Sequence, residues 1–246
     1  MNSAIEEIVN TLPKINAHYD PTAESSLLNT YLTQLSRGDI EWLKYVQQIL
    51  GSCLTNEPCK KMFILYGTGS NGRTTLMKLM QSLLGPLALK LSSNIIAKNS
   101  SDPISIINTQ MILIEEFSYN LQLDAAKIKS LLSTDYIVHC NRTTTKPKHK
   151  IFLVINEFLN FHDSIESLRD RIVVIPFHTK FVYDPQDNNE FSRDPFVLQR
   201  LLNDETAKSA LFNWLLEGIK LSKEIPLIIP NSIQMATDNY FYKRRS

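Results

Sequence analysis

Short apolar runs in the middle of the chain alternate with segments that have helical periodicity. From residue 62 onward, five runs of four or five residues are almost wholly apolar, and the segments between them have apolar residues every three or four positions. Strands that are apolar on both faces are typical of a mostly parallel sheet covered by helices. The pattern therefore predicts an α/β fold with strands at 62–66, 87–91, 111–114, 151–155 and 172–176.

Both ends of the chain have the apolar spacing of helices. In 39-DIEWLKYVQQILG-51, apolar residues recur every three or four positions, Asp39 can cap the N-terminus and Gly51 can close the C-terminus. Residues 24–35 behave similarly, and residues 206–224 give the clearest helical pattern near the end of the chain. We therefore expect helical extensions before and after the sheet region in the sequence.

Composition narrows the setting but names no partner. The 246 residues are 43% hydrophobic, enough for one good core, and the net charge of +1 gives no overall basic character. The three cysteines lack CxxC spacing, and no apolar run approaches the roughly 18 residues of a membrane span. We expect an intracellular, reduced protein with no membrane segment, and the sequence does not separate host cytoplasm from an organelle.

The stretch GTGSNGRT at residues 67–74 has the spacing of a phosphate-binding loop between a strand and a helix. Three of the four fixed positions of G-x-x-x-x-G-K-[ST] are met, and glycines let backbone N–H groups turn toward phosphate oxygens at a helix N-terminus. The alternative is a glycine-rich turn with no ligand. The predicted nucleotide contacts are Gly67, Thr68, Gly69, Ser70, Asn71, Gly72, Arg73, Thr74 and Thr75, with the Thr74 hydroxyl as a Mg²⁺ ligand.

Arg73 stands where the loop motif has lysine. Lysine is a compact charge on a flexible stem, whereas guanidinium is a wider planar fork with a different reach. Losing one positioned charge in a phosphoryl-transfer site commonly costs on the order of a hundredfold or more in rate. We expect slow but real hydrolysis, and a catalytically dead subunit that binds nucleotide or DNA is the alternative.

Polar side chains follow two other predicted strands. Glu115 and Glu116 end the run 111-MILIEEFS-118, and Asn156 ends 151-IFLVIN-156. The carboxyl ends of parallel strands share one edge of a sheet, so these groups are expected beside the phosphate loop. Glu115 would help hold Mg²⁺, while the second carboxylate and Asn156 would orient the attacking water. The alternatives are a solvated acidic pair and a turn asparagine.

Two arginines precede the last predicted strand. In 168-LRDRIVVIPF-177, Arg169 and Arg171 lie just before a buried run. An arginine at this position could reach across a subunit boundary to a neighbour's nucleotide. The alternative is a surface salt bridge with Asp170 or Glu166.

A basic segment without acids lies between Asp135 and Glu157. Such a loop can follow a single-stranded backbone without reading its sequence, and the affinity should fall with salt. The alternative is an ordinary solvated hairpin. The basic residues are Arg142, Lys146, Lys148, His149 and Lys150, of which the first three are the predicted DNA contacts.

In their order and spacing, these motifs resemble the superfamily 3 helicase ATPases, a branch of the AAA+ proteins, and especially the primase-helicases of poxviruses, phages and plasmids. The resemblance covers residues from about 30 to the C-terminus and includes YGTGSNGRTT, MILIEE, AAKIKSLLSTDYIVHCNR, FLVIN and LRDRIVVIPF. It implies that Lys129 is a nucleotide-site residue, Asn156 a sensor and Arg171 the arginine finger, with Arg169 as second choice. The segment before the sensor strand would form a DNA-contacting hairpin.

The resemblance also implies an AAA+ type parallel sheet flanked by helices, with helical segments at 1–58 and 191–246 around an ATPase core at 59–190. ATP and Mg²⁺ would bind between subunits of a homo-oligomeric ring, most simply a hexamer, around single-stranded or forked DNA. A primase is a further partner, and the setting is replication of a virus, phage, plasmid or mobile element. We expect the ATPase core alone in this chain. A small-molecule kinase fits the loop but not the later motifs.

Overall fold

The computed structural model describes residues 3–98, 109–115, 117, 121–133, 138–140, 143–145, 148–161 and 165–242. The chain divides into two compact units, each made from three separate segments. We call them the helical unit (Met1–Thr55, Gly69–Gly85 and Phe177–Pro230) and the sheet unit (Asn56–Thr68, Pro86–Pro176 and Asn231–Ser246). The chain passes from the sheet unit to the helical unit within the phosphate loop, between Thr68 and Gly69.

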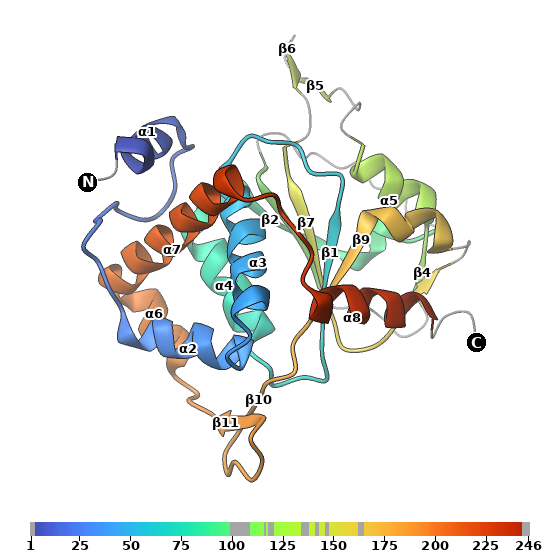
Figure 1. Cartoon of the computed structure of the whole chain (residues 1–246). Coiled ribbons are helices and arrows are strands. Elements are labelled where there is room, and N and C mark those ends of the chain that lie inside the picture. Colours follow the sequence, from blue (N-terminus) through green and yellow to red (C-terminus); the bar gives the residue numbers. More distant parts are fainter. Residues whose placement is uncertain are drawn as a thin grey trace. The chain divides into compact units, whose positions relative to one another are not determined.

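A five-stranded, wholly parallel sheet forms the centre of the sheet unit, in the order β2-β3-β7-β1-β9 (Figure 1). All five predicted strands are confirmed, with ends that differ by no more than one residue. The strands are β1 (Met62–Tyr66), β2 (Ala88–Ser92), β3 (Met111–Glu115), β7 (Lys150–Ile155) and β9 (Ile172–Pro176).

One hydrophobic core joins this sheet to the helices of the same unit, which are α5 (Ala125–Leu131), η4 (Ile165–Arg171) and α8 (Asn231–Tyr242). Every second strand residue belongs to this core because strand side chains alternate between faces; Ile64, Ile114, Leu153 and Val174 are examples. Helix α8 packs against β9, and the Thr237 hydroxyl accepts a hydrogen bond from the backbone N–H of Val174 at 3.0 Å. The predicted α/β class is confirmed.

Short strand pairs and 3₁₀ turns complete the described chain. The strands β4 (Gln122–Leu123) and β8 (Asn160–Phe161) pair in parallel, as do β10 (Lys180–Val182) and β11 (Glu190–Ser192), whereas β5 (Val138–Cys140) and β6 (Thr143–Thr145) form an antiparallel pair. The turns are η1 (Ser52–Leu54), η2 (Gly85–Leu87) and η3 (Ser93–Ile96).

The helical unit contains α1 (Ser3–Thr11), α2 (Ser26–Ser36), α3 (Ile40–Gly51), α4 (Arg73–Leu84), α6 (Val197–Asn203) and α7 (Glu205–Glu224). The predicted cap is confirmed, because the Asp39 carboxylate accepts a hydrogen bond from the Trp42 N–H at 2.9 Å at the start of α3. Although α7 has 20 residues, neither it nor any other helix in the described ranges combines such length with the apolar composition that a bilayer crossing requires.

Gly51 does not close α3 as predicted. It is the last helical residue, with φ −58° and ψ −39°, and the cap position is Ser52. A Cβ atom on Gly51 would lie 2.5 Å from the carbonyl oxygen of Leu215 on α7, and a Cβ on Gly218 would lie 2.4 Å from the carbonyl oxygen of Gln47. The two glycines are therefore required by the close crossing of α3 and α7.

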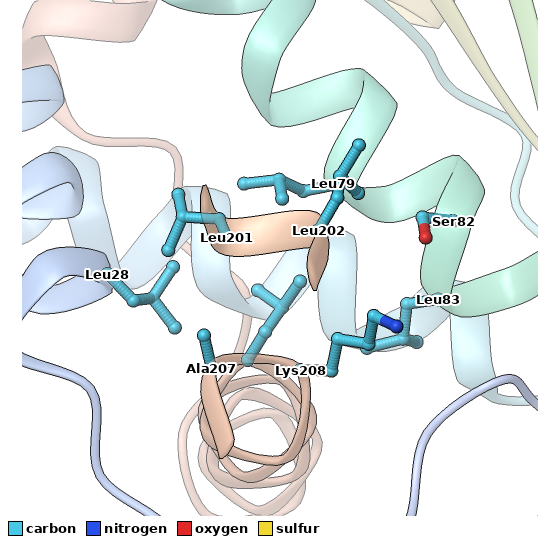
Figure 2. Close-up of a pocket in the computed structure, with 9 residues that line it drawn as sticks. Leu28, Leu79, Ser82, Leu83, Leu201, Leu202, Ala207 and Lys208 are labelled. Carbon is cyan, nitrogen blue, oxygen red and sulfur yellow. The ribbon is translucent and has the colours of Figure 1, made fainter. Parts of the chain in front are cut away.

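A small apolar cavity lies between helices α2, α4, α6 and α7 of the helical unit (Figure 2). Its volume is ≈ 10 Å³, about the space of one water molecule, and its walls offer few polar groups. This cavity is a gap in the packing and not a ligand site. It is lined by Leu28, Leu79, Ser82, Leu83, Leu201, Leu202, Ala207, Lys208 and Leu211.

Candidate nucleotide site

The carboxyl edge of the parallel sheet brings three of the predicted site positions together. Gly67 follows β1, Glu115 is the last residue of β3, and Asn156 follows β7, which lies between those two strands. The register pairs Tyr66 with Ile155, so Gly67 and Asn156 lie level on neighbouring strands. This edge therefore presents a carboxylate and an amide next to the start of the phosphate loop, as expected from parallel strands.

Glu115 has a partner that the sequence analysis missed. The ammonium of Lys90, on the adjacent strand β2, lies 3.2 Å from a carboxylate oxygen of Glu115. The side chain of Glu115 is 13% exposed and that of Lys90 is 46% exposed, so the carboxylate is the shielded member of the pair. A lone lysine within the apolar run 87-LALKL-91 was the available signal. The other predicted acid, Glu116, lies outside the described residues.

The part of the phosphate loop in the helical unit has an unusual backbone. Gly69, Ser70 and Gly72 have φ angles of 95°, 47° and 83°, all in the left-handed region. Left-handed residues turn successive N–H groups inward, and such concave loops bind anions. Helix α4 begins at Arg73, as predicted, and Thr74 in its first turn is exposed. Left-handed residues followed by the start of a helix are backbone features that can bind an anion.

Two neighbouring elements hold the loop in this shape. The Tyr31 hydroxyl on α2 donates to the Gly72 carbonyl at 2.8 Å, and the Phe181 N–H on β10 donates to the Ser70 carbonyl at 2.7 Å. Burial raises the pKa of Tyr31 well above its ordinary value, so the hydroxyl stays protonated and keeps its donor. The sequence analysis identified neither residue as a partner of the loop, because both contacts are distant in sequence.

The side chain of Arg73 is shielded from solvent. It is only 3% exposed, and its Nε donates to the Asn71 Oδ1 at 2.8 Å. Asn71 is also 3% exposed, and its Nδ2 has no hydrogen-bond partner within the described part of the chain. The residue that departs from the lysine motif is thus held by its own loop.

Lys129 lies in the last turn of α5 and is half-buried. Its ammonium makes no hydrogen bond or ion pair within the described ranges. Its neighbour Lys127, by contrast, donates to the Ala97 carbonyl at 2.6 Å. Of these two lysines on α5, Lys129 is the one whose ammonium is not engaged by the described chain.

The two candidate finger arginines lie at the opposite edge of the sheet, where β9 begins. Arg169 is 2.9 Å from Asp238 and 3.5 Å from Glu166, and its guanidinium lies 5.3 Å from the centre of the Phe241 ring. The salt-bridge interpretation therefore applies to Arg169. Arg171 is half-buried, and its guanidinium makes no hydrogen bond or ion pair in the described part of the chain. Neither arginine lies at the carboxyl edge that holds Glu115.

The basic segment contains a backbone hairpin formed by the antiparallel strands β5 and β6, which precede β7. Two of the three predicted DNA contacts, Arg142 and Lys146, lie outside the described residues. The third, Lys148, is half-buried.

The expectation that His149 and Lys150 belong to this exposed basic segment is wrong. They are 4% and 1% exposed, because they lie where β7 enters the sheet. The Lys150 ammonium donates to the Glu57 carbonyl at 3.0 Å, and His149 Nε2 lies 3.0 Å from the Leu131 carbonyl oxygen. Burial lowers the pKa of His149, and the charge of Lys150 acts in the same direction.

Comparisons with known proteins find viral relatives at low identity. A protein of Acanthamoeba polyphaga mimivirus named "Putative helicase L207/L206" is 22% identical over 232 residues, covering 87% of this chain and 24% of the relative. A protein of Frog virus 3 (isolate Goorha) named "Putative helicase 022R" is 24% identical over 154 residues, covering 56% of this chain and 16% of the relative. No protein-family model matches the chain.

Among solved structures, the apo structure of the NrS-1 C-terminal region (305–718) has a TM-score of 0.67 at 16% identity, and covers 95% of this chain. A second apo form of that region has a TM-score of 0.61 at 13% identity. The fold is therefore shared along nearly the whole chain. The chain spans about a quarter or less of the two viral relatives and about half of the solved region, at 24%, 16% and 54% of their lengths.

Proposed function

We propose that this chain is the ATP-hydrolysing core of a DNA helicase or translocase of the superfamily 3 type, in the AAA+ branch. One observation supports this most directly: Gly67, Glu115 and Asn156 meet at the carboxyl edge of one parallel sheet, and the loop that begins there has three left-handed residues. The helicase names of the two viral relatives support the same function.

The residues present fit ATP with Mg²⁺. The inward-turned amides of the loop and the N-terminus of α4 would bind the phosphates, aided by Arg73 and Lys129. The exposed Thr74 hydroxyl and the Glu115 carboxylate would hold Mg²⁺, which neutralises charge that develops on the phosphates. Glu116 and Asn156 would orient the attacking water.

The larger assembly follows from the same proposal. Arg171 would act on the nucleotide of an adjacent subunit in a homo-oligomeric ring, most simply a hexamer, since it does not share an edge with Glu115 in its own chain. Arg142, Lys146 and Lys148 would contact single-stranded or forked DNA during replication of a virus, phage, plasmid or mobile element, with a primase as a further partner. The ATPase core would span residues 59–190.

A second candidate function is a subunit that binds nucleotide or DNA and does not hydrolyse ATP. The burial of Arg73 and its bond to Asn71 favour this candidate, because a guanidinium held within the loop cannot follow the phosphates as a lysine can.

Turnover of Arg73→Lys separates the two functions. We expect slow ATP hydrolysis by the wild type and hydrolysis about tenfold faster or more by Arg73→Lys, because lysine restores a mobile charge at the transferring phosphoryl group. Phosphate release is measured with and without single-stranded DNA, and Thr74→Ala serves as the inactive reference. Absence of turnover in both proteins would reject the enzyme and leave the binding subunit. Equal, fast rates would show that Arg73 does not limit the reaction.

A further inference from the structure

Asn71 and Arg73 form a buried pair within the phosphate loop. The Arg73 Nε donates to the Asn71 Oδ1 at 2.8 Å, and each residue is 3% exposed. They are separated in sequence only by Gly72, which has a left-handed φ of 83°. The backbone turn at this glycine brings the two side chains together.

A bond to Nε has a consequence for arginine that it would not have for lysine. The guanidinium is planar and has five N–H donors, so fixing Nε fixes the plane in which the terminal nitrogens lie. An ammonium is a point charge with three rotating donors and has no plane to fix. Phosphate recognition by arginine depends on that planar geometry, since the strong contact is bidentate.

The acceptor is itself held in place. The residues on either side of Asn71 are anchored, because the Ser70 carbonyl accepts from the Phe181 N–H at 2.7 Å and the Gly72 carbonyl accepts from the Tyr31 hydroxyl at 2.8 Å. These two hydrogen bonds hold the backbone on both sides of Asn71. The Asn71 side chain is therefore a well-positioned acceptor for the longer, more flexible arginine side chain.

The side-chain nitrogen of Asn71 suggests that the loop binds a ligand. Its Nδ2 is buried and has no hydrogen-bond partner within the described part of the chain. A buried donor without an acceptor is rare in native proteins because it is costly, and such groups commonly have a functional reason. A phosphate oxygen bound in the loop would supply the missing acceptor.

We propose that Asn71 is the positioning residue for Arg73, and that the two side chains bind nucleotide phosphate as one unit. This inference rests on the proposed function, since it requires a nucleotide in the loop. The bond to Nε orients the guanidinium toward the phosphates, and Nδ2 donates to the same group. Asn71 thereby compensates in part for the absence of the motif lysine, so that a loop with arginine still binds nucleotide.

A double-mutant cycle with Mg²⁺ and a fluorescent, non-hydrolysable ATP analogue tests this pairing. Asn71→Ala should weaken binding about a hundredfold or more when Arg73 is present, because it removes both the Nδ2 donor and the orientation of the guanidinium. In the Arg73→Lys background, Asn71→Ala should weaken binding only about tenfold, because the Nδ2 donor is lost but an ammonium needs no orientation. Asn29→Ala, which removes an exposed asparagine on α2, is the matched control and should leave binding unchanged.

Each other outcome is decisive. Equal weakening in both backgrounds, or no weakening in either, would overturn the positioning role while leaving nucleotide binding intact. Failure of the wild type and of Arg73→Lys to bind the analogue would overturn the proposed function, and this inference with it. If Asn71→Ala does not fold by circular dichroism, Asn71→Ser takes its place, since its oxygen is one bond closer to the backbone and cannot reproduce the contact, and the same contrast is expected.

Discussion

Of the two loop glycines Gly69 and Gly72, Gly72 is the one that tolerates a side chain less. Its φ of 83° is left-handed, and a Cβ there would lie 2.5 Å from Leu35 Cδ2 and 3.1 Å from a Phe181 ring carbon. Gly69 has a similar φ of 95°, but a Cβ on it would meet nothing within 4 Å. A side chain at Gly69 would therefore cause backbone strain alone, whereas a side chain at Gly72 would cause both strain and steric crowding.

We expect Gly69→Ala to lower the free energy of unfolding by about 1–2 kcal/mol through backbone strain alone. Gly72→Ala should cost a further 1–3 kcal/mol or so, because the methyl group must displace the Leu35 side chain and the Phe181 ring. Urea unfolding followed by circular dichroism measures both variants. A cost for Gly72→Ala no larger than that for Gly69→Ala would show that α2 and β10 give way freely at this point.

At the scale of single residues, the backbone conformation of the loop could be predicted from the sequence, whereas the side-chain contacts within the site could not. The glycine spacing of the loop requires left-handed turns, so the loop and the start of α4 at Arg73 could be predicted. The bond from Arg73 to Asn71 depends on the rotamers of two buried side chains. The ion pair of Glu115 with Lys90 depends on which strand lies beside β3, and local sequence does not contain that information.

Strand β7 begins next to a buried histidine, and this gives the element a dependence on pH. His149 Nε2 must carry the proton, because the Leu131 carbonyl 3.0 Å away can only accept, and Nδ1 is then a bare nitrogen with no partner in the described chain. Burial, with a smaller contribution from the charge of Lys150, lowers the pKa of His149 below its ordinary value. The folded state therefore favours the neutral imidazole.

The sign of the effect follows by linkage. Once the pH falls below the unfolded-state pKa of about 6.5, the unfolded chain binds a proton that the folded chain does not, so stability decreases until the folded-state pKa is reached. His149→Gln, which keeps an amide donor for Leu131, should lose less stability than wild type between about pH 7.5 and pH 5. Urea midpoints across this range measure the difference. A residual slope is expected because burial also lowers the pKa of His178, whereas identical slopes in both proteins would contradict the assignment.

At the scale of elements, β1, β3, β7 and β9 could be predicted because each is apolar on both faces, which leaves a buried parallel sheet as the consistent solution. The role of Gly51 could not be predicted, because a side chain there would clash with the carbonyl of Leu215 on α7, which is far away in sequence. The burial of Lys150 was missed for a similar reason. Its charge suggested an exposed loop, while its acceptor is a backbone carbonyl of Glu57.

At the scale of the whole molecule, the basic segment should account for most of the salt-dependent affinity for single-stranded DNA, because the net charge of +1 provides no general attraction. The triple variant of Arg142, Lys146 and Lys148 to alanine should reduce the slope of log affinity against log salt by about 2, because each neutralised phosphate of a single strand contributes roughly 0.7 to that slope. Fluorescence anisotropy of a labelled oligonucleotide measures the slope. ATP-analogue binding should be unchanged.

The matched control removes the same charge elsewhere. Lys44, Lys78 and Lys223 are exposed lysines on α3, α4 and α7, and their triple alanine variant loses three positive charges outside the basic segment. We expect this control to retain the wild-type slope. Equal slopes for the two triple variants would assign the attraction to overall charge and remove the DNA site from the basic segment.

The last prediction concerns whether the ATP site is shared between subunits. Arg171 lies at the amino edge of the sheet and Glu115 at the carboxyl edge, so a finger role for Arg171 requires a second copy of the chain. Arg171→Ala and Thr74→Ala should each be nearly inactive alone, because the first lacks the arginine finger and the second lacks a Mg²⁺ ligand. Mixed one to one, they should recover about a quarter of wild-type turnover, because a random ring pairs an intact loop with an intact finger at about one interface in four.

Arg169→Ala is the control, since the ion pair of Arg169 with Asp238 in its own chain assigns it a structural role, and this variant should stay active without mixing. An inactive mixture, or an Arg171→Ala protein with wild-type turnover, would mean that each chain completes its site without Arg171 from a neighbour.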